Sequence, residues 1–106
     1  YMRYHKLLTL SENGYITRCN GCKHYRLAFG TTLIYLSNQE LKEFYQNTAE
    51  QLKRFPHEGF YNQKVIQIEL PTPNSCMILN YKELTQLADM LTEVNLLEQV
   101  ERFLAV

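Results

Sequence analysis

Two cysteines three residues apart are the side chains of this sequence best suited to chemistry. Cys19 and Cys22 lie in the segment Y-I-T-R-C-N-G-C-K-H-Y-R-L-A-F-G, residues 15–30. Such a pair can ligate a metal, form a redox couple or simply flank a turn. Asn20-Gly21 between two alternating segments predicts a two-residue β-hairpin turn, because both turn positions favour a positive φ. Cys19 and Cys22 would then face each other across the strands, but the turn does not explain why both flanks are cysteine.

A zinc knuckle would explain that coincidence, since a tight turn can aim two thiolates at one ion. A complete site needs further ligands, and the sequence has no second C-x-x-C. His5, on a strand expected beside the hairpin, is the best-placed histidine. We therefore predict Cys19, Cys22 and His5 as the metal residues of a complete or vestigial knuckle, with zinc as the cofactor. Cys76, in the apolar segment C-M-I-L, is expected in the core.

Two other functions stay open. A thiol-redox protein could use Cys19 and Cys22, although the segment after Cys22 alternates like a strand and offers no helix N-terminus to stabilise a thiolate. A nucleic-acid-binding domain could use the basic N-terminal hairpin, because residues 1–36 carry a net charge of +4 and residues 37–106 a net charge of −4. Its candidate residues are Arg3, Lys6, Arg18, Lys23 and Arg26 on phosphates, with Tyr25 stacking on a base.

Composition favours one soluble domain over residues 1–106, because 45% of the residues are hydrophobic and 21% are charged. No apolar run approaches the roughly 20 residues that cross a bilayer, and no signal peptide is evident, so we expect a cytoplasmic protein without a membrane partner. The odd number of cysteines does not favour a disulfide scaffold. Nucleophile-elbow, Walker, zincin and dinucleotide-binding motifs are all missing from the sequence, which argues against an enzyme.

Alternation and capping signals predict an α+β fold: an antiparallel sheet of about five strands, made of a meander and a second hairpin, with two or three helices packed on one face. T-T-L-I-Y-L, residues 31–36, is apolar on both faces and is expected in the middle of the sheet. S-x-x-E at residues 37–40 and N-x-x-E at residues 80–83 predict helix starts. The resulting hairpin–helix units span about 15–55 and 64–93, and Asn95 with Glu98 suggests a separate short helix over 95–104.

The segments G-Y-I-T-R-C-N-G-C and L-A-F-G resemble an uncharacterised family of short bacterial proteins, a domain of unknown function. Its pattern is a G-Y-[IV]-x-x-C-x-x-C hairpin followed by F-G, here matched by Gly14, Tyr15, Cys19, Cys22, Phe29 and Gly30. The resemblance implies a family fold but no activity. It also implies a cysteine or histidine near the N-terminus that could complete a metal site, and His5 is the residue here that answers to it.

The sequence thus predicts a non-enzymatic binding or adaptor module whose partner is another protein or a second copy of the chain. If the first strand lies at a sheet edge, it could pair with the first strand of a second copy. Leu8→Lys is then expected to leave a folded monomer and to weaken the dimer.

Overall fold

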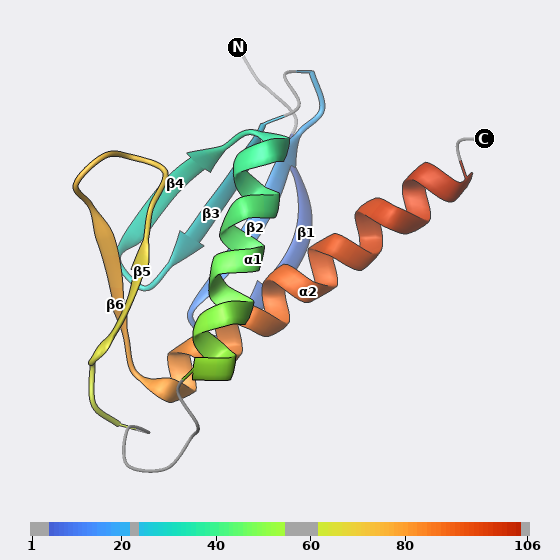
Figure 1. The fold of residues 1–106 in the computed structure, drawn as a ribbon. Helices are drawn as coiled ribbons and strands as arrows, with labels where there is room; N and C mark the ends of the chain where they lie inside the picture. Colours follow the sequence, from blue (N-terminus) through green and yellow to red (C-terminus); the bar gives the residue numbers. More distant parts are fainter. Residues whose placement is uncertain (1–4, 22–23, 55–61, 105–106) are drawn as a thin grey trace.

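The computed structural model describes residues 5–21, 24–54 and 62–104. Along the chain the elements are β1 (His5–Ser11), β2 (Gly14–Cys19), β3 (Tyr25–Phe29), β4 (Thr32–Leu36), α1 (Asn38–Arg54), β5 (Ile66–Glu69), β6 (Cys76–Leu79) and α2 (Tyr81–Leu104). The first four strands form an antiparallel meander in the order β1-β2-β3-β4, and β5 and β6 form a separate antiparallel pair (Figure 1). The α+β class, the meander and the second hairpin are confirmed. The predicted number of strands is wrong, because the described residues form six strands in two sheets.

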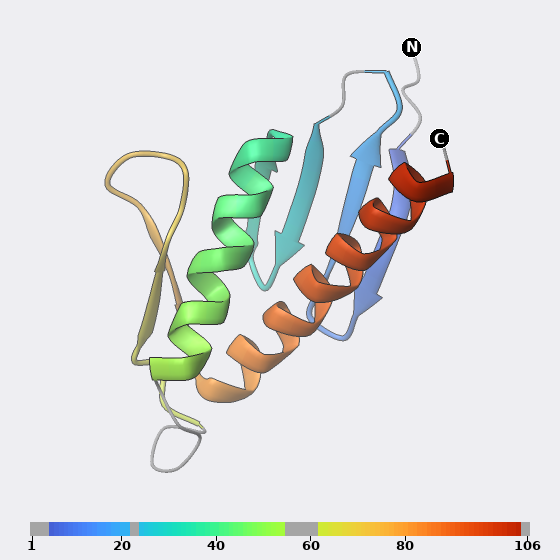
Figure 2. The ribbon, with the colours of Figure 1, turned by 45° about the vertical axis from the view of Figure 1, so that its right-hand side comes forward.

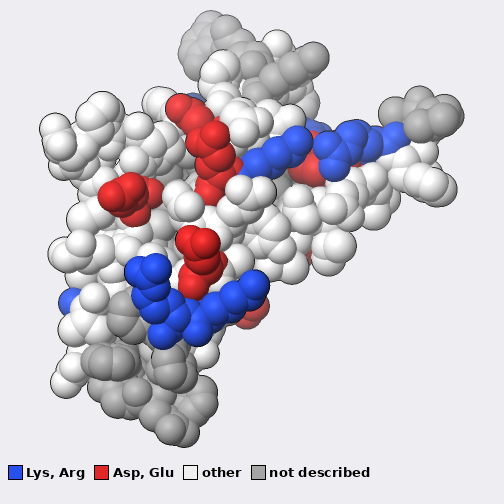
Figure 3. All heavy atoms as spheres, viewed as in Figure 1, with Lys and Arg blue, Asp and Glu red and all other residues white. Residues whose placement is uncertain are grey.

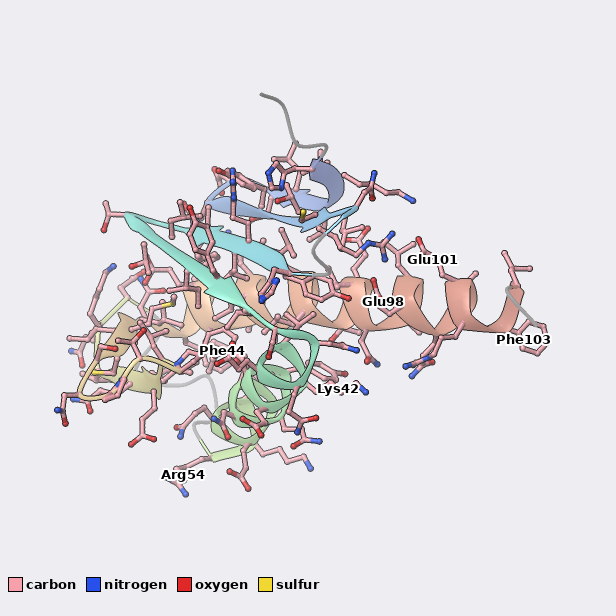
Figure 4. All side chains as sticks on the ribbon, turned by 90° about the horizontal axis from the view of Figure 1, so that it is seen from above. Lys42, Phe44, Arg54, Glu98, Glu101 and Phe103 are labelled. Atoms are coloured by element: carbon pink, nitrogen blue, oxygen red, sulfur yellow. The ribbon has the colours of Figure 1, made fainter. Side chains whose placement is uncertain are left out.

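Both helices cover the same face of the four-stranded sheet. Seen from above, the sheet lies on one side and α1 and α2 on the other (Figure 4). The core forms between them, because the inward side chains of the strands alternate with outward ones and meet the apolar stripes of the helices. Its fully buried members include Ile16, Leu27, Leu36, Phe44, Leu84, Leu87 and Val94. The β5–β6 hairpin packs beside the helices and adds Ile66, Ile68, Met77 and Leu79.

Both predicted capping boxes are present. At the start of α1, the Ser37 amide donates to Glu40 Oε1 at 2.9 Å and the Glu40 amide donates to Ser37 Oγ at 3.1 Å. Asn80 and Glu83 make the same reciprocal pair before α2. The predicted separate helix over 95–104 is wrong, since α2 continues through Asn95 to Leu104. No proline or glycine interrupts residues 81–104, so nothing in the backbone ends the helix at that point.

The hairpin at C-N-G-C has a different register from the predicted one. Arg18 pairs with Tyr25, and the Cys19 amide donates to the His24 carbonyl at 2.8 Å. Cys19 therefore lies opposite His24 and not opposite Cys22. Alternation could not distinguish these registers, because moving one strand by two residues leaves every side chain on the same face.

Candidate functional site

The outer face of the four-stranded sheet, on the side away from the helices, is an uncovered apolar surface. Its residues follow from the strand register: Leu10, Tyr15, Ala28 and Leu33 form one row across the strands, and Leu7, Thr17, Arg26 and Tyr35 form the next. Leu7, Leu10, Leu33 and Tyr35 are between 50% and 69% exposed. At about 100 Å² for each side chain, they present roughly 400 Å² of apolar surface on the two edge strands, with Tyr15 and Ala28 half-buried between them, an amount typical of a binding site.

β4 supplies Leu33 and Tyr35 to this surface, which is exposed because both helices pack on the other face of the sheet. T-T-L-I-Y-L is apolar on both sides, which predicted a central strand, but β4 is the edge of the meander. Leu36 points into the core, whereas Leu33 and Tyr35 point outward into solvent. The prediction was wrong because two-sided apolar character shows that both faces favour burial, without showing that the chain itself buries them. A strand of this kind at a sheet edge is therefore a signal for an interaction surface.

Among the residues of the two rows just named, Arg26 is the only charged one. The Arg26 guanidinium is 5.5 Å from the centre of the Tyr35 ring and 3.2 Å from His5 Nε2. Because a guanidinium can only donate, His5 Nε2 is the acceptor in this contact, which leaves Nδ1 as the donor of the ring. His5 Nδ1 and the hydroxyl of Thr17, a residue only 9% exposed, are buried with no hydrogen-bond partner. Two unpartnered polar groups thus flank a cation, which is the arrangement that an incoming carboxylate would satisfy.

The cysteine hairpin lies at one end of the same sheet. Cys19 is buried and disulfide-bonded. Cys76, on β6, is a free and exposed cysteine, so the prediction that Cys76 lies in the core is wrong. Cys22 lies outside the described residues. Arg18, Cys19, Asn20, Tyr25, Asn38 and Glu98 line an open hollow here. The hollow includes the first residue of α1, so the fold supplies the helix N-terminus that the local sequence lacked.

The described residues do not complete a zinc site. His5 and Cys19 are register neighbours on β1 and β2, which agrees with the choice of His5 as the nearest histidine. However, the sulfur of Cys19 is in a disulfide and the Nε2 atom of His5 lies beside the cationic Arg26. Within residues 5–21, 24–54 and 62–104, no group of three or more potential ligands is gathered to hold a metal ion. The zinc knuckle therefore stays a prediction.

The basic residues predicted to bind nucleic acid do not share one surface. Arg26 lies on the outer face, whereas Lys6 and Arg18 lie on the helix-bearing face, where α2 meets them with acidic side chains. Arg18 forms ion pairs with Glu98 and, at 2.9 Å, with Glu101, while Lys6 lies 3.3 Å from Glu101. Figure 3 shows basic and acidic groups side by side on that face of the molecule. Two further candidates, at positions 3 and 23, lie outside the described residues.

This ion-pair cluster shifts several pKa values. The hydrogen bond with Arg18 is the main cause that lowers the pKa of Glu101, and Lys6 adds to it. The hydrogen bond with Glu101 likewise raises the pKa of Arg18. Burial, followed by a hydrogen bond with Glu98, raises the pKa of Tyr25 to about 12. The cluster attaches the second half of α2 to β1 and β2, so its role in the fold is structural.

The first strand is at a sheet edge, as edge pairing with a second copy requires. Leu8, however, is buried in the core at a register irregularity between Leu7 and Thr9. The expectation that Leu8→Lys leaves a folded monomer is therefore wrong, since a lysine there would bury a charge without a partner.

The chain belongs to a family of unknown function, DUF6686, whose model matches residues 2–106. This confirms the expected membership of an uncharacterised family. No curated protein and no solved structure matches the chain. Neither helix in the described part of the chain is long and apolar enough to span a bilayer.

Proposed function

We propose that this domain is a non-enzymatic protein-binding module, and that its binding surface is the outer face of the four-stranded sheet. The observation that carries the proposal is the set of exposed apolar side chains on the face of the sheet that neither helix covers. A sheet normally buries one face against another layer and keeps a polar face in water. Here the second face is apolar as well, which favours a partner that supplies the missing layer.

The partner that best fits this face is an apolar protein segment carrying a carboxylate. Arg26 lies between the two edges of the sheet, the unpartnered groups of His5 and Thr17 lie near it, and none of the rows of the outer face holds an acidic residue. A carboxylate would pair with the guanidinium and accept from both groups, while the leucines would bury apolar side chains around it. Since these two polar atoms are covered in the unbound protein, binding would have to displace a neighbouring side chain such as Leu7.

A thiol-redox function has one observation in its favour, the hollow that brings Cys19 to the N-terminus of α1. The charges near it oppose the reactive thiolate that such a protein needs. Arg18 is already paired with two carboxylates, and Glu40 occupies the first turn of α1. A net negative surrounding raises the cost of a thiolate, so we assign the disulfide of Cys19 a structural role.

The proposal is tested by selecting peptides from a random displayed library on the wild-type protein. Enriched peptides should combine apolar residues with Asp or Glu. Tyr35→Ser should weaken their binding by about 30-fold, the effect of removing an aromatic anchor from an interface, and Arg26→Met should remove the preference for acidic residues. Ile78→Ser is the matched control, because Ile78 is also an exposed apolar strand residue but lies on β6. Peptides that bind Tyr35→Ser as tightly as wild type would refute the proposal.

A further inference from the structure

The last turns of α2 carry an apolar stripe that no described part of the chain covers. The stripe consists of Leu96, Leu97, Val100, Phe103 and Leu104, which are between 36% and 80% exposed. Val94, Glu98 and Glu101 face the body of the protein with the spacing i, i+4, i+7, and the stripe repeats that spacing two residues later, on the opposite side of the helix. Figures 1 and 4 show this end of α2 running out past β1.

We propose that this stripe binds the same stripe of a second copy of the chain, in an antiparallel helix pair with its two-fold axis at Val100. Leu96 of each copy would then lie opposite Leu104 of the other. The inference is independent of the proposed function, because the pair leaves the outer face of the sheet open.

The area of the stripe is sufficient for a symmetric dimer. At about 100 Å² for each side chain, five side chains bury about 500 Å² on each copy and about 1,000 Å² in the pair. That total is at the lower limit for specific interfaces, so we expect a dissociation constant on the order of 10 μM. Five large apolar side chains exposed together on one helix are unusual in a monomer and typical of an interaction site.

The charges around the stripe favour a protein partner over a membrane surface. A helix that lies on an anionic bilayer carries Lys or Arg along its polar face. The last three turns of α2 carry a single cation, Arg102, and the carboxylates of Glu98 and Glu101 are paired with Arg18 and Lys6 on the side that faces the body. One arginine gives little attraction to lipid phosphates, whereas an antiparallel pair buries only the uncharged stripe.

The shape of the molecule favours the antiparallel arrangement. The first half of α2 packs against α1 and the sheet, and its last turns cross β1 at the edge of the sheet (Figure 2), where Lys6 pairs with Glu101. An antiparallel pair places the two bodies at opposite ends, where they do not collide, while a parallel pair would bring both bodies to the same end. Packing the stripe on the outer sheet face of the next copy would join two different surfaces on opposite sides of the molecule. Such contacts form open chains unless a rotation closes them.

Sedimentation velocity over a concentration series tests the dimer. The wild-type protein should shift from the mass of one 12.6 kDa chain to twice that mass as concentration rises. Val100→Glu should weaken this association by at least ~100-fold, because two carboxylates would meet across the axis. Gln99→Glu adds the same charge at the neighbouring exposed position, off the stripe, and should keep the dimer. A wild-type protein that stays monomeric up to about 1 mM, well above the expected dissociation constant, overturns the proposal. A Val100→Glu variant that dimerises as tightly as wild type would also overturn it.

Disulfide trapping tests the geometry without relying on the glutamate variant. In a Cys76→Ser background, which removes the free exposed cysteine, Val100→Cys should cross-link two copies rapidly under oxidation. Leu96→Cys should not, because in the antiparallel pair the two copies of that position are about 12 Å apart along the axis. A disulfide needs Cα atoms about 4.4–6.8 Å apart. Equal cross-linking at both positions would contradict the antiparallel pair.

Discussion

Arg18→Met should destabilise the protein by detaching the second half of α2 from the sheet. The guanidinium is paired with Glu98 and Glu101, and its removal leaves two carboxylates one helical turn apart without a cation between them. Methionine keeps most of the apolar stem, so the substitution mainly removes charge and hydrogen bonds. We therefore expect a loss of stability without a change of fold.

The magnitude follows from the burial of the Arg18–Glu98 pair. The two side chains are 18% and 22% exposed, so the pair is intermediate between a surface and a buried ion pair. Surface pairs contribute ~0.2–1 kcal/mol, and disrupting a buried pair costs ~3–5 kcal/mol. We expect a loss of about 2 kcal/mol in the free energy of unfolding, or roughly 10 °C in Tm for a domain of this size. Lys6→Met is the matched control: its pair is largely exposed and should cost less than ~0.5 kcal/mol.

Urea denaturation at pH 7 measures the free energy of unfolding of both variants. The same measurement at acidic pH provides a second test. The hydrogen bond with Arg18 holds the folded-state pKa of Glu101 below its ordinary value. The ionised Glu101 carboxylate therefore stabilises the folded state fully above its ordinary pKa, and this stabilisation is lost as the pH falls through the folded-state pKa. The difference between wild type and Arg18→Met should therefore shrink in acid. A loss at pH 7 no larger than that of Lys6→Met would refute the account of how α2 is held.

Three further outcomes are expected. Gly14→Ala should cost more than ~3 kcal/mol in urea denaturation, because a Cβ atom there would lie 1.9 Å from the Ala28 carbonyl oxygen and would force β2 from β3; a wild-type midpoint would contradict this contact. The pKa of Tyr25 is raised to about 12, so stability should be complete below pH ~10 and fall as pH rises towards 12, and Tyr25→Phe should lose less there. Because Cys19 is disulfide-bonded, protein purified without a tag or reductant should hold only traces of zinc by mass spectrometry. About one zinc per chain after reduction, lost when Cys19 and Cys22 are both serine, would establish the knuckle.

Features set by local chemistry could be predicted from the sequence. The capping boxes at Ser37 and Asn80 depend on side chains three residues away, and the structure contains both. Alternation likewise predicted the meander and the second hairpin, and the structure contains both. In each case the interactions that decide the structure lie within a few residues of one another.

Features set by distant contacts could not be predicted. The C-N-G-C turn depends on which residue of β3 pairs with Arg18, and a two-residue shift preserves every face. The edge position of β4 depends on which strands pair across the sheet, and the apolar pattern of residues 31–36 does not record that pairing. The binding face went unrecognised because sequence cannot tell an apolar strand covered by the chain from one left for a partner.

The central claim is that the outer face of the four-stranded sheet binds an apolar, acidic protein segment. The most direct measurement is a titration of isotope-labelled protein with a library-selected peptide, followed by amide chemical shifts. The account predicts saturable changes centred on Leu7, Arg26, Leu33 and Tyr35, with α2 unaffected. Changes confined to the helices or to the β5–β6 hairpin would contradict it.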